Sequence, residues 1–186
     1  MPRLWTETID EHRRSVRDAA LDAAATLVTE HGLSAVTMSR IAQETGIGRA
    51  TLYKYFPDVD AILLAWHQRQ VHRHLRQLAD VRDRAADPLA AVLAAYAEIQ
   101  HGHGGGEAEA LVHAGAHQVH ARQALHDLVR DLLRDGVRDG RVRDDVPPAE
   151  LAAFCVHALG AAAGAPSRAA VRRLVALTLA AVRPQA

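Results

Sequence analysis

The chain has 186 residues and no net formal charge, because 22 Lys and Arg residues balance 22 Asp and Glu residues. This length holds one domain or two small ones, and 49% hydrophobic against 24% charged residues exclude a disordered polyelectrolyte. Aromatic residues make up only 4%, while alanine, the strongest helix former, accounts for 38 residues. The composition therefore predicts an all-α fold and argues against a β-sandwich.

No pattern typical of export or membrane insertion is present in the sequence. The single cysteine, Cys155, excludes an internal disulfide and suits a reducing compartment. The first 15 residues are polar and lack the apolar segment of a signal peptide. The longest stretch without Asp, Glu, Lys or Arg, residues 151–167, is shorter than the roughly 20 apolar residues of a membrane-spanning helix. We expect a cytoplasmic protein with no membrane partner and no cofactor.

The N-terminal third is expected to form three helices followed by a long fourth one. Apolar residues spaced three and four apart predict a first helix that Ser15 caps and Gly32 ends. Thr37 is expected to cap the second helix, Gly46 to end it, and Asp58 to cap the fourth. The second, third and fourth helices are expected over residues 38–45, 49–56 and 58–82.

The remainder is expected to form five more helices, which gives nine in all. A glycine-rich break at 101–106 and a proline-containing turn at 139–148 separate some of them. The five expected helices cover residues 88–101, 107–119, 121–138, 148–164 and 167–183.

The segment TMSRIAQETGIGRATLYKYF, residues 37–56, predicts a helix-turn-helix unit whose second helix enters a DNA major groove. At the start of that helix, Arg49 suits a guanine edge and Thr51 suits a thymine methyl group. Hydroxyl and ammonium groups elsewhere in the segment suit phosphate oxygens. The expected DNA-contacting residues are Thr37, Ser39, Arg40, Arg49, Ala50, Thr51, Tyr53, Lys54 and Tyr55.

Local charge adds modest support for DNA binding. In this segment Arg40, Arg49 and Lys54 outweigh Glu44, whereas residues 1–56 as a whole sum to zero. A plain helical hairpin with surface aromatic residues is the alternative interpretation of the pattern alone.

Residues 16–64 resemble the DNA-binding domain of the tetracycline-repressor (TetR) family. The block GIGRATLYKYFP, residues 46–57, is the most specific part of a match that covers about a quarter of the chain. The sequence departs from the family pattern at Val28, usually Phe, at Gly48, usually Ser, and at Val59-Asp60, where a basic residue is common. Other matching residues are Ala23, Ala24, Leu27, Gly32, Val36, Thr37, Ile41, Ala42 and Leu63.

The resemblance implies a homodimeric transcriptional regulator, usually a repressor, which a small ligand releases from a pseudo-palindromic operator in double-stranded DNA. It implies a DNA-binding domain over residues 1–57 and a ligand-binding and dimerisation domain over residues 58–186. The ligand pocket would lie in the second domain, with Trp66, Leu93, Tyr96, Leu111, His113, His117 and Phe154 as candidate lining residues.

The last two expected helices are also candidates for the dimer interface on composition alone. Between Ala149 and Val182 only Glu150, Arg168, Arg172 and Arg173 are charged, so both helices are too apolar for a single small chain to cover. We expect them to form a four-helix bundle with a second copy. The candidate interface residues are Leu151, Leu159, Leu174 and Leu177.

A histidine stripe leaves a second interpretation open, that of a metal-binding protein or enzyme. His113, His117 and His120 are spaced four and three apart, which places three imidazoles on one helical face. No tight Cys/His spacing supports a metal site, and no nucleophile–base pair follows from spacing, so we expect neither a metal nor an enzyme. A purely structural helical interaction module is the third possibility.

Overall fold

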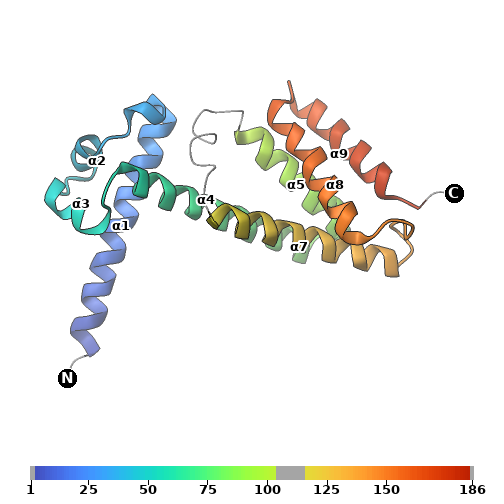
Figure 1. Cartoon of the computed structure of the whole chain (residues 1–186), viewed down its shortest axis with the longest axis horizontal. Coiled ribbons are helices and arrows are strands. Elements are labelled where there is room, and N and C mark those ends of the chain that lie inside the picture. Colours follow the sequence, from blue (N-terminus) through green and yellow to red (C-terminus); the bar gives the residue numbers. More distant parts are fainter. Residues whose placement is uncertain (1–2, 104–115, 185–186) are drawn as a thin grey trace. The chain divides into compact units, whose positions relative to one another are not determined.

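The structure is a computed structural model that describes residues 3–103 and 116–184 (Figure 1). These residues form α-helices and two short 3₁₀ helices, without a strand among them, which confirms the expected all-α class. Eight of the nine expected helices are represented, and the remaining one, residues 107–119, falls mostly outside the described residues. None of the helices seen in the structure combines the length and the apolar character needed to cross a bilayer.

The described residues divide into two compact units, and residues 3–70 form the first. Its elements are α1 (Arg3–His31), the 3₁₀ helix η1 (Leu33–Ala35), α2 (Met38–Thr45), α3 (Arg49–Tyr55) and the first part of α4 (Val59–Arg84). α1 contacts α2 and α3, so the longest helix supports the two shortest. The most deeply buried side chains of this core are Ala20, Ala24, Leu27, Ile41, Leu52, Phe56 and Ile62.

The first helix is longer than the sequence predicts. We expected Ser15 to cap it, but α1 already begins at Arg3, and Ser15 lies exposed within the helix. No glycine or proline interrupts residues 3–31, so nothing in the sequence stops the helix from extending. The predicted end is confirmed, because Gly32 adopts a positive φ of 78° and its N–H donates to the carbonyl of Val28 at 3.0 Å.

The second unit contains the remaining part of α4, α5 (Pro88–His103), α7 (Ala116–Arg138), α8 (Pro148–Gly160), η2 (Ala161–Gly164) and α9 (Arg168–Val182). α5 packs against α7, α8 and α9, so this helix lies at the centre of the unit. Its fully buried side chains include Val92, Leu93, Val129, Leu133, Cys155 and Leu159.

Two predicted helix boundaries in this unit are wrong. A break near residue 120 was expected, but α7 begins at Ala116 and continues to Arg138. The expected helix 148–164 ends as an α-helix at Gly160 and tightens into η2. The two units divide inside α4, between Gln70 and Val71, whereas the functional boundary after residue 57 stays a prediction.

Candidate nucleic-acid interface

The turn between α2 and α3 is built from local hydrogen bonds that the sequence specifies. Thr37 caps α2, because its Oγ1 accepts from the Arg40 N–H at 3.2 Å. Gly46 ends α2 in the left-handed region, at φ 68°, where a side chain would be strained. Beside it, the Thr45 hydroxyl donates to the carbonyl of Ile41 at 2.7 Å and accepts from the Ile47 N–H at 3.2 Å. The predicted cap and turn are therefore confirmed.

α3 is a helix of seven residues that packing holds in place. Gly48 precedes it without a side-chain cap, although its carbonyl accepts from the Thr51 and Leu52 N–H groups at 2.8 and 3.1 Å. Leu52 is completely buried and Phe56 is 2% exposed, which anchors one face of the helix in the core of this unit. A helix this short is marginal alone, so its orientation depends on these two side chains.

The opposite face of the helix-turn-helix segment is open to solvent. Arg49 and Ala50 are exposed at the start of α3, and Tyr53, at 47% exposure, and Lys54 are exposed further along. Thr51 and Tyr55 are only half-buried, and Tyr55 packs against the core with part of its ring. On α2 and at its cap, the predicted contact residues Thr37, Ser39 and Arg40 are exposed, as are Gln43 and Glu44.

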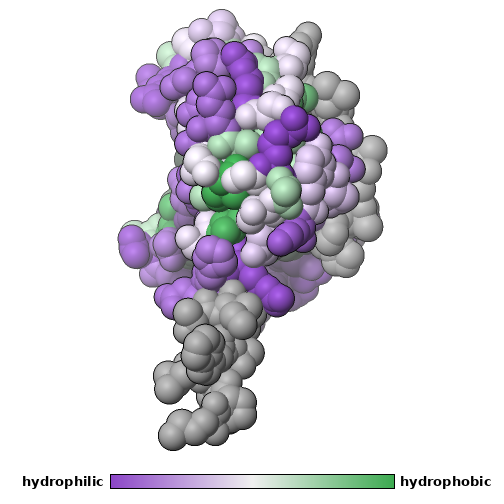
Figure 2. All heavy atoms as spheres, turned by 90° about the vertical axis from the view of Figure 1, so that its left-hand side faces the viewer, coloured by the Kyte–Doolittle hydropathy of each residue, from purple (hydrophilic) through white to green (hydrophobic). Residues whose placement is uncertain are grey.

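The positive charges of this face lack acidic partners in the structure. Within residues 3–103 and 116–184, Arg40, Arg49 and Lys54 form no ion pair. Glu44 is the one acidic residue of the segment 37–56, so the segment carries a net charge of +2. Figure 2 faces the side of the molecule on which α2 and α3 lie in Figure 1, and hydrophilic residues surround a small apolar area there. The unpaired side chains of Arg40, Arg49 and Lys54 remain available for phosphates and base edges.

Two arginines that sequence analysis did not single out stabilise the same unit. The Arg17 guanidinium carbon lies 4.7 Å from the ring centroid of Phe56, and its Nη1 is 3.4 Å from the carbonyl oxygen of Tyr55. Arg69 of α4 pairs with Asp22 at 2.6 Å and with Asp18 at 3.8 Å, both on α1. The acidic pair is spaced four apart on α1, but its partner lies 47 residues further on, so spacing alone does not reveal the contact.

The predicted ligand-pocket residues occupy different environments. Leu93 is fully buried and Tyr96 is 8% exposed in the second unit, whereas Phe154 is 45% exposed on α8. Trp66 is half-buried against the core of the first unit, and its Nε1–H has no hydrogen-bond partner among the described groups. Leu111 and His113 lie outside the described residues, and the structure does not describe the His117 side chain. The pocket stays a prediction.

The predicted dimer interface needs a correction at two of its four positions. Leu151 and Leu159 are 5% and 0% exposed within the core of their own chain, so neither offers a surface to a partner. Both belong to the core of the second unit, where α8 packs against α5, α7 and α9. Leu177 on α9 is 68% exposed and Leu174 is half-buried, so these two remain candidates.

The metal interpretation gains no support from the part of the chain that the structure describes. No group of three or more His, Cys, Asp or Glu residues there is arranged to hold a metal ion. The His113, His117 and His120 stripe lies where side chains are not described. Burial raises the pKa of the Cys155 thiol to about 11, so this sulfur is protonated at neutral pH and unsuited to nucleophilic attack.

Comparisons with known proteins agree with this geometry. Residues 20–66 match the family model of bacterial regulatory proteins of the tetR family. Over 79 residues the chain is 35% identical to the uncharacterized HTH-type transcriptional regulator Rv1255c of Mycobacterium tuberculosis, a match covering 40% of this chain and 39% of that protein. It is 33% identical over 76 residues to the HTH-type transcriptional repressor LfrR of Mycolicibacterium smegmatis, covering 41% and 36%. The chain thus spans about two fifths of these curated relatives.

The fold likeness extends much further than the sequence likeness. SmeT, the repressor of the multidrug efflux pump SmeDEF of Stenotrophomonas maltophilia, superposes with a TM-score of 0.70 at 22% identity, over 90% of each chain. Another structure of SmeT is a complex with triclosan. At this identity the likeness establishes the shared all-α fold alone. The family match and the geometry of α2 and α3 together show that residues 20–66 form a helix-turn-helix domain of the tetR family of bacterial regulatory proteins.

Proposed function

We propose that the chain is a transcriptional regulator, acting as a repressor, that binds a pseudo-palindromic operator as a homodimer and leaves it when a small ligand binds. One observation carries the proposal: the exposed face of α2 and α3 presents Arg40, Arg49 and Lys54 without acidic partners among the described residues. Arg49 at the start of α3 suits base edges, and Lys54 near its end suits phosphates. The roles of LfrR and SmeT as repressors support repression as the direction of regulation.

The homodimer is supported by a partly exposed apolar stripe on α9 and an exposed aromatic residue on α8, which packs against α9. Ala170, Leu174, Leu177 and Ala181 follow one another four, three and four residues apart, which places them on one face of α9. Leu177 is 68% exposed and Phe154 of α8 is 45% exposed, and α8 packs against α9. Large apolar side chains this open to water are typical of an interaction surface. Two copies related by a two-fold axis would present two α3 helices to two half-sites.

We propose that a small ligand regulates the protein, based on the fold and on the SmeT–triclosan complex, but we do not identify the ligand. We place it in the second unit and expect a small, partly apolar molecule with one or two polar groups. It would act by preferring the conformation that does not bind DNA. Native mass spectrometry of the purified protein, together with thermal-shift screening of metabolites and metals, tests this part. If no compound raises the melting temperature or alters operator binding, the ligand-release part fails while DNA binding stands.

DNA binding is tested by selecting duplexes from a random library with the purified full chain. We expect the enriched sequences to share an inverted repeat, and fluorescence anisotropy to give tighter binding to this operator than to a scrambled duplex. Failure to enrich any sequence would contradict the proposal and favour the structural or metal-binding alternative.

The dimer is tested by placing a charge on the exposed stripe. Leu177→Glu should weaken association by on the order of 2 kcal/mol or more, because a carboxylate would be buried without a partner. Leu64→Glu is the matched control, since Leu64 is also an exposed leucine, at 38%, but belongs to α4 in the first unit. Sedimentation velocity should show the Leu177 variant dissociating and the control unchanged. A wild-type chain that is monomeric at micromolar concentration would refute the dimer.

A further inference from the structure

The C-terminal end of α3 is contacted by a cationic side chain from α1. The Arg17 guanidinium lies over the Phe56 ring, with its carbon 4.7 Å from the ring centroid, and its Nη1 donates to the carbonyl oxygen of Tyr55 at 3.4 Å. Both elements belong to the first unit. Arg17 forms no ion pair with any carboxylate among the described side chains, so its charge is not neutralised within this unit.

This end of α3 has few other means of stabilisation. Tyr55 is the last helical residue, and Phe56 follows in an extended conformation, so no left-handed residue closes the helix. The carbonyls of the last turn therefore need donors from elsewhere, and they carry the partial negative charge of a helix C-terminus. The Phe56 N–H satisfies the carbonyl of Leu52 at 3.0 Å, and Arg17 supplies both a donor and a positive charge to the carbonyl of Tyr55.

The shape of the guanidinium suits this double contact. Its plane stacks on an aromatic ring while its N–H groups donate from the edge, whereas the compact ammonium of lysine cannot do both at once. Phe56 is 2% exposed, so the ring that Arg17 covers is itself fixed in the core. Movement at this end of a helix of seven residues would be transmitted to Arg49 at its other end.

We propose that Arg17 is a positioning residue for DNA recognition: it holds the C-terminal end of α3 against α1 and thereby fixes the orientation of Arg49 and Thr51. The proposal rests on the proposed function, in which α3 contacts base edges. It assigns to Arg17 a role in sequence discrimination that requires no contact between Arg17 and DNA.

Three variants of the full-length chain test the assignment. Arg17→Ala removes the stack and the donor, Arg17→Lys keeps the charge, and Arg17→Met keeps an apolar stem over the ring. Arg134→Ala, on α7 in the second unit, matches the loss of one exposed arginine. Anisotropy titrations with the selected operator and with a scrambled duplex, each over a series of salt concentrations, give the affinity ratio and the salt dependence.

If Arg17 positions α3, the Ala, Lys and Met variants all bind the operator about three- to tenfold more weakly. Affinity for the scrambled duplex stays nearly unchanged, and the slope of log affinity against log salt stays at the wild-type value. Hydrogen exchange at the Phe56 amide, which donates to Leu52, should also be faster in all three. The Arg134 variant should match the wild type in each measurement.

Two results would overturn the proposal. Rescue by lysine together with a salt slope about one unit smaller in the Ala variant would make Arg17 a phosphate contact. A lowered melting temperature with an unchanged operator-to-scrambled ratio would leave Arg17 a purely structural role. A wild-type chain that enriches no duplex would instead refute the proposed function, and the hydrogen-exchange measurement would then show whether the contact stabilises α3.

Discussion

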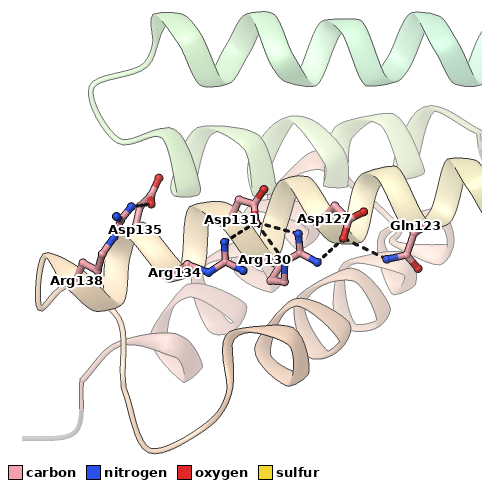
Figure 3. A network of polar contacts seen from close by, with 7 residues as sticks. All are labelled: Gln123, Asp127, Arg130, Asp131, Arg134, Asp135 and Arg138. Carbon is pink, nitrogen blue, oxygen red and sulfur yellow. Dashed lines mark hydrogen bonds and ion pairs between the residues drawn. The ribbon is translucent and has the colours of Figure 1, made fainter.

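The helix-turn-helix segment and α7 both carry several arginines, but the two regions use them differently. On α7, three of the arginines, Arg130, Arg134 and Arg138, each contact an aspartate of the same helix (Figure 3). Arg130 contacts Asp127 at 2.5 Å and Asp131 at 3.0 Å, Arg134 contacts Asp131 at 3.1 Å, and Arg138 pairs with Asp135. On α2 and α3, Arg40, Arg49 and Lys54 have no such partners among the described residues.

The difference explains how a chain with no net charge can carry a cationic surface. An arginine paired within its own helix has its field largely neutralised, and its donors are occupied. An unpaired arginine on an exposed helix keeps its positive field and its hydrogen-bond donors free for an external anion. The global composition therefore conceals a local asymmetry, and only the spacing of acids and bases along each helix exposes it.

Among substitutions that remove a cation from the helix-turn-helix segment, the largest effect is expected at Arg49. Arg49→Ala should weaken operator binding by about 1–3 kcal/mol and relax the preference at one base position, because a bidentate contact is lost. Arg134→Ala removes the same charge from α7 and should leave DNA affinity unchanged. Anisotropy with the operator and its single-base variants measures both. An unchanged sequence preference in the Arg49 variant would show that another residue contacts the base.

A smaller effect is expected at Lys54. Lys54→Ala should weaken binding to operator and scrambled duplexes alike, and lower the salt slope by about one, because a phosphate contact carries no sequence information. Arg138→Ala, which removes a paired cation near the end of α7, is the control. A loss confined to the operator would instead assign Lys54 to base recognition.

The elements with local signals were predicted well from sequence. Thr37, Gly46 and Asp58 act through their own neighbours in the chain, so the caps and turn follow from residue type and spacing. The composition of α8 identified it as apolar, but composition could not show which face its own chain would cover. Leu151 and Leu159 were therefore assigned to a partner surface although they fill the core.

Two contacts of the first unit that sequence analysis missed join residues far apart in the chain. Arg17 meets the carbonyl of Tyr55, 38 residues away, and Arg69 meets Asp22 at a separation of 47. Neither pair leaves a periodic trace, because the contact depends on how α1 packs against α3 and α4. The same reason explains why Ser15 looked like a cap: nothing local distinguishes a cap from an exposed serine inside a longer helix.

Removing the aspartates of α7 tests whether unpaired arginines there would also bind DNA. A triple variant, Asp127→Asn, Asp131→Asn and Asp135→Asn, leaves the arginines of α7 unpaired and raises the net charge by three. Binding to scrambled DNA should strengthen modestly at low salt, while the operator-to-scrambled ratio falls. The melting temperature should drop only slightly, because these pairs are exposed. An operator affinity that rises in proportion would mean that charge alone, and not the arrangement on α3, determines recognition.

The smallest effect is expected from pH, at His126 of α7, whose pKa is shifted. Desolvation is the main cause that lowers the pKa of His126 from its usual 6.5. Two nearby cationic or ionisable groups lower it further: Arg122, and His157, whose ring centroid lies 6.2 Å from that of His126. Asp127 raises this pKa and so partly offsets them. The folded protein therefore binds this proton less readily than the unfolded chain, so stability is fully present above pH 6.5 and falls as the pH drops through 6.5 toward the lower folded-state pKa. His126→Gln removes that penalty, so its melting temperature should fall less than that of the wild type between neutral pH and about pH 5. Thermal melts of both proteins across this range would contradict the assignment if the two curves shifted in parallel.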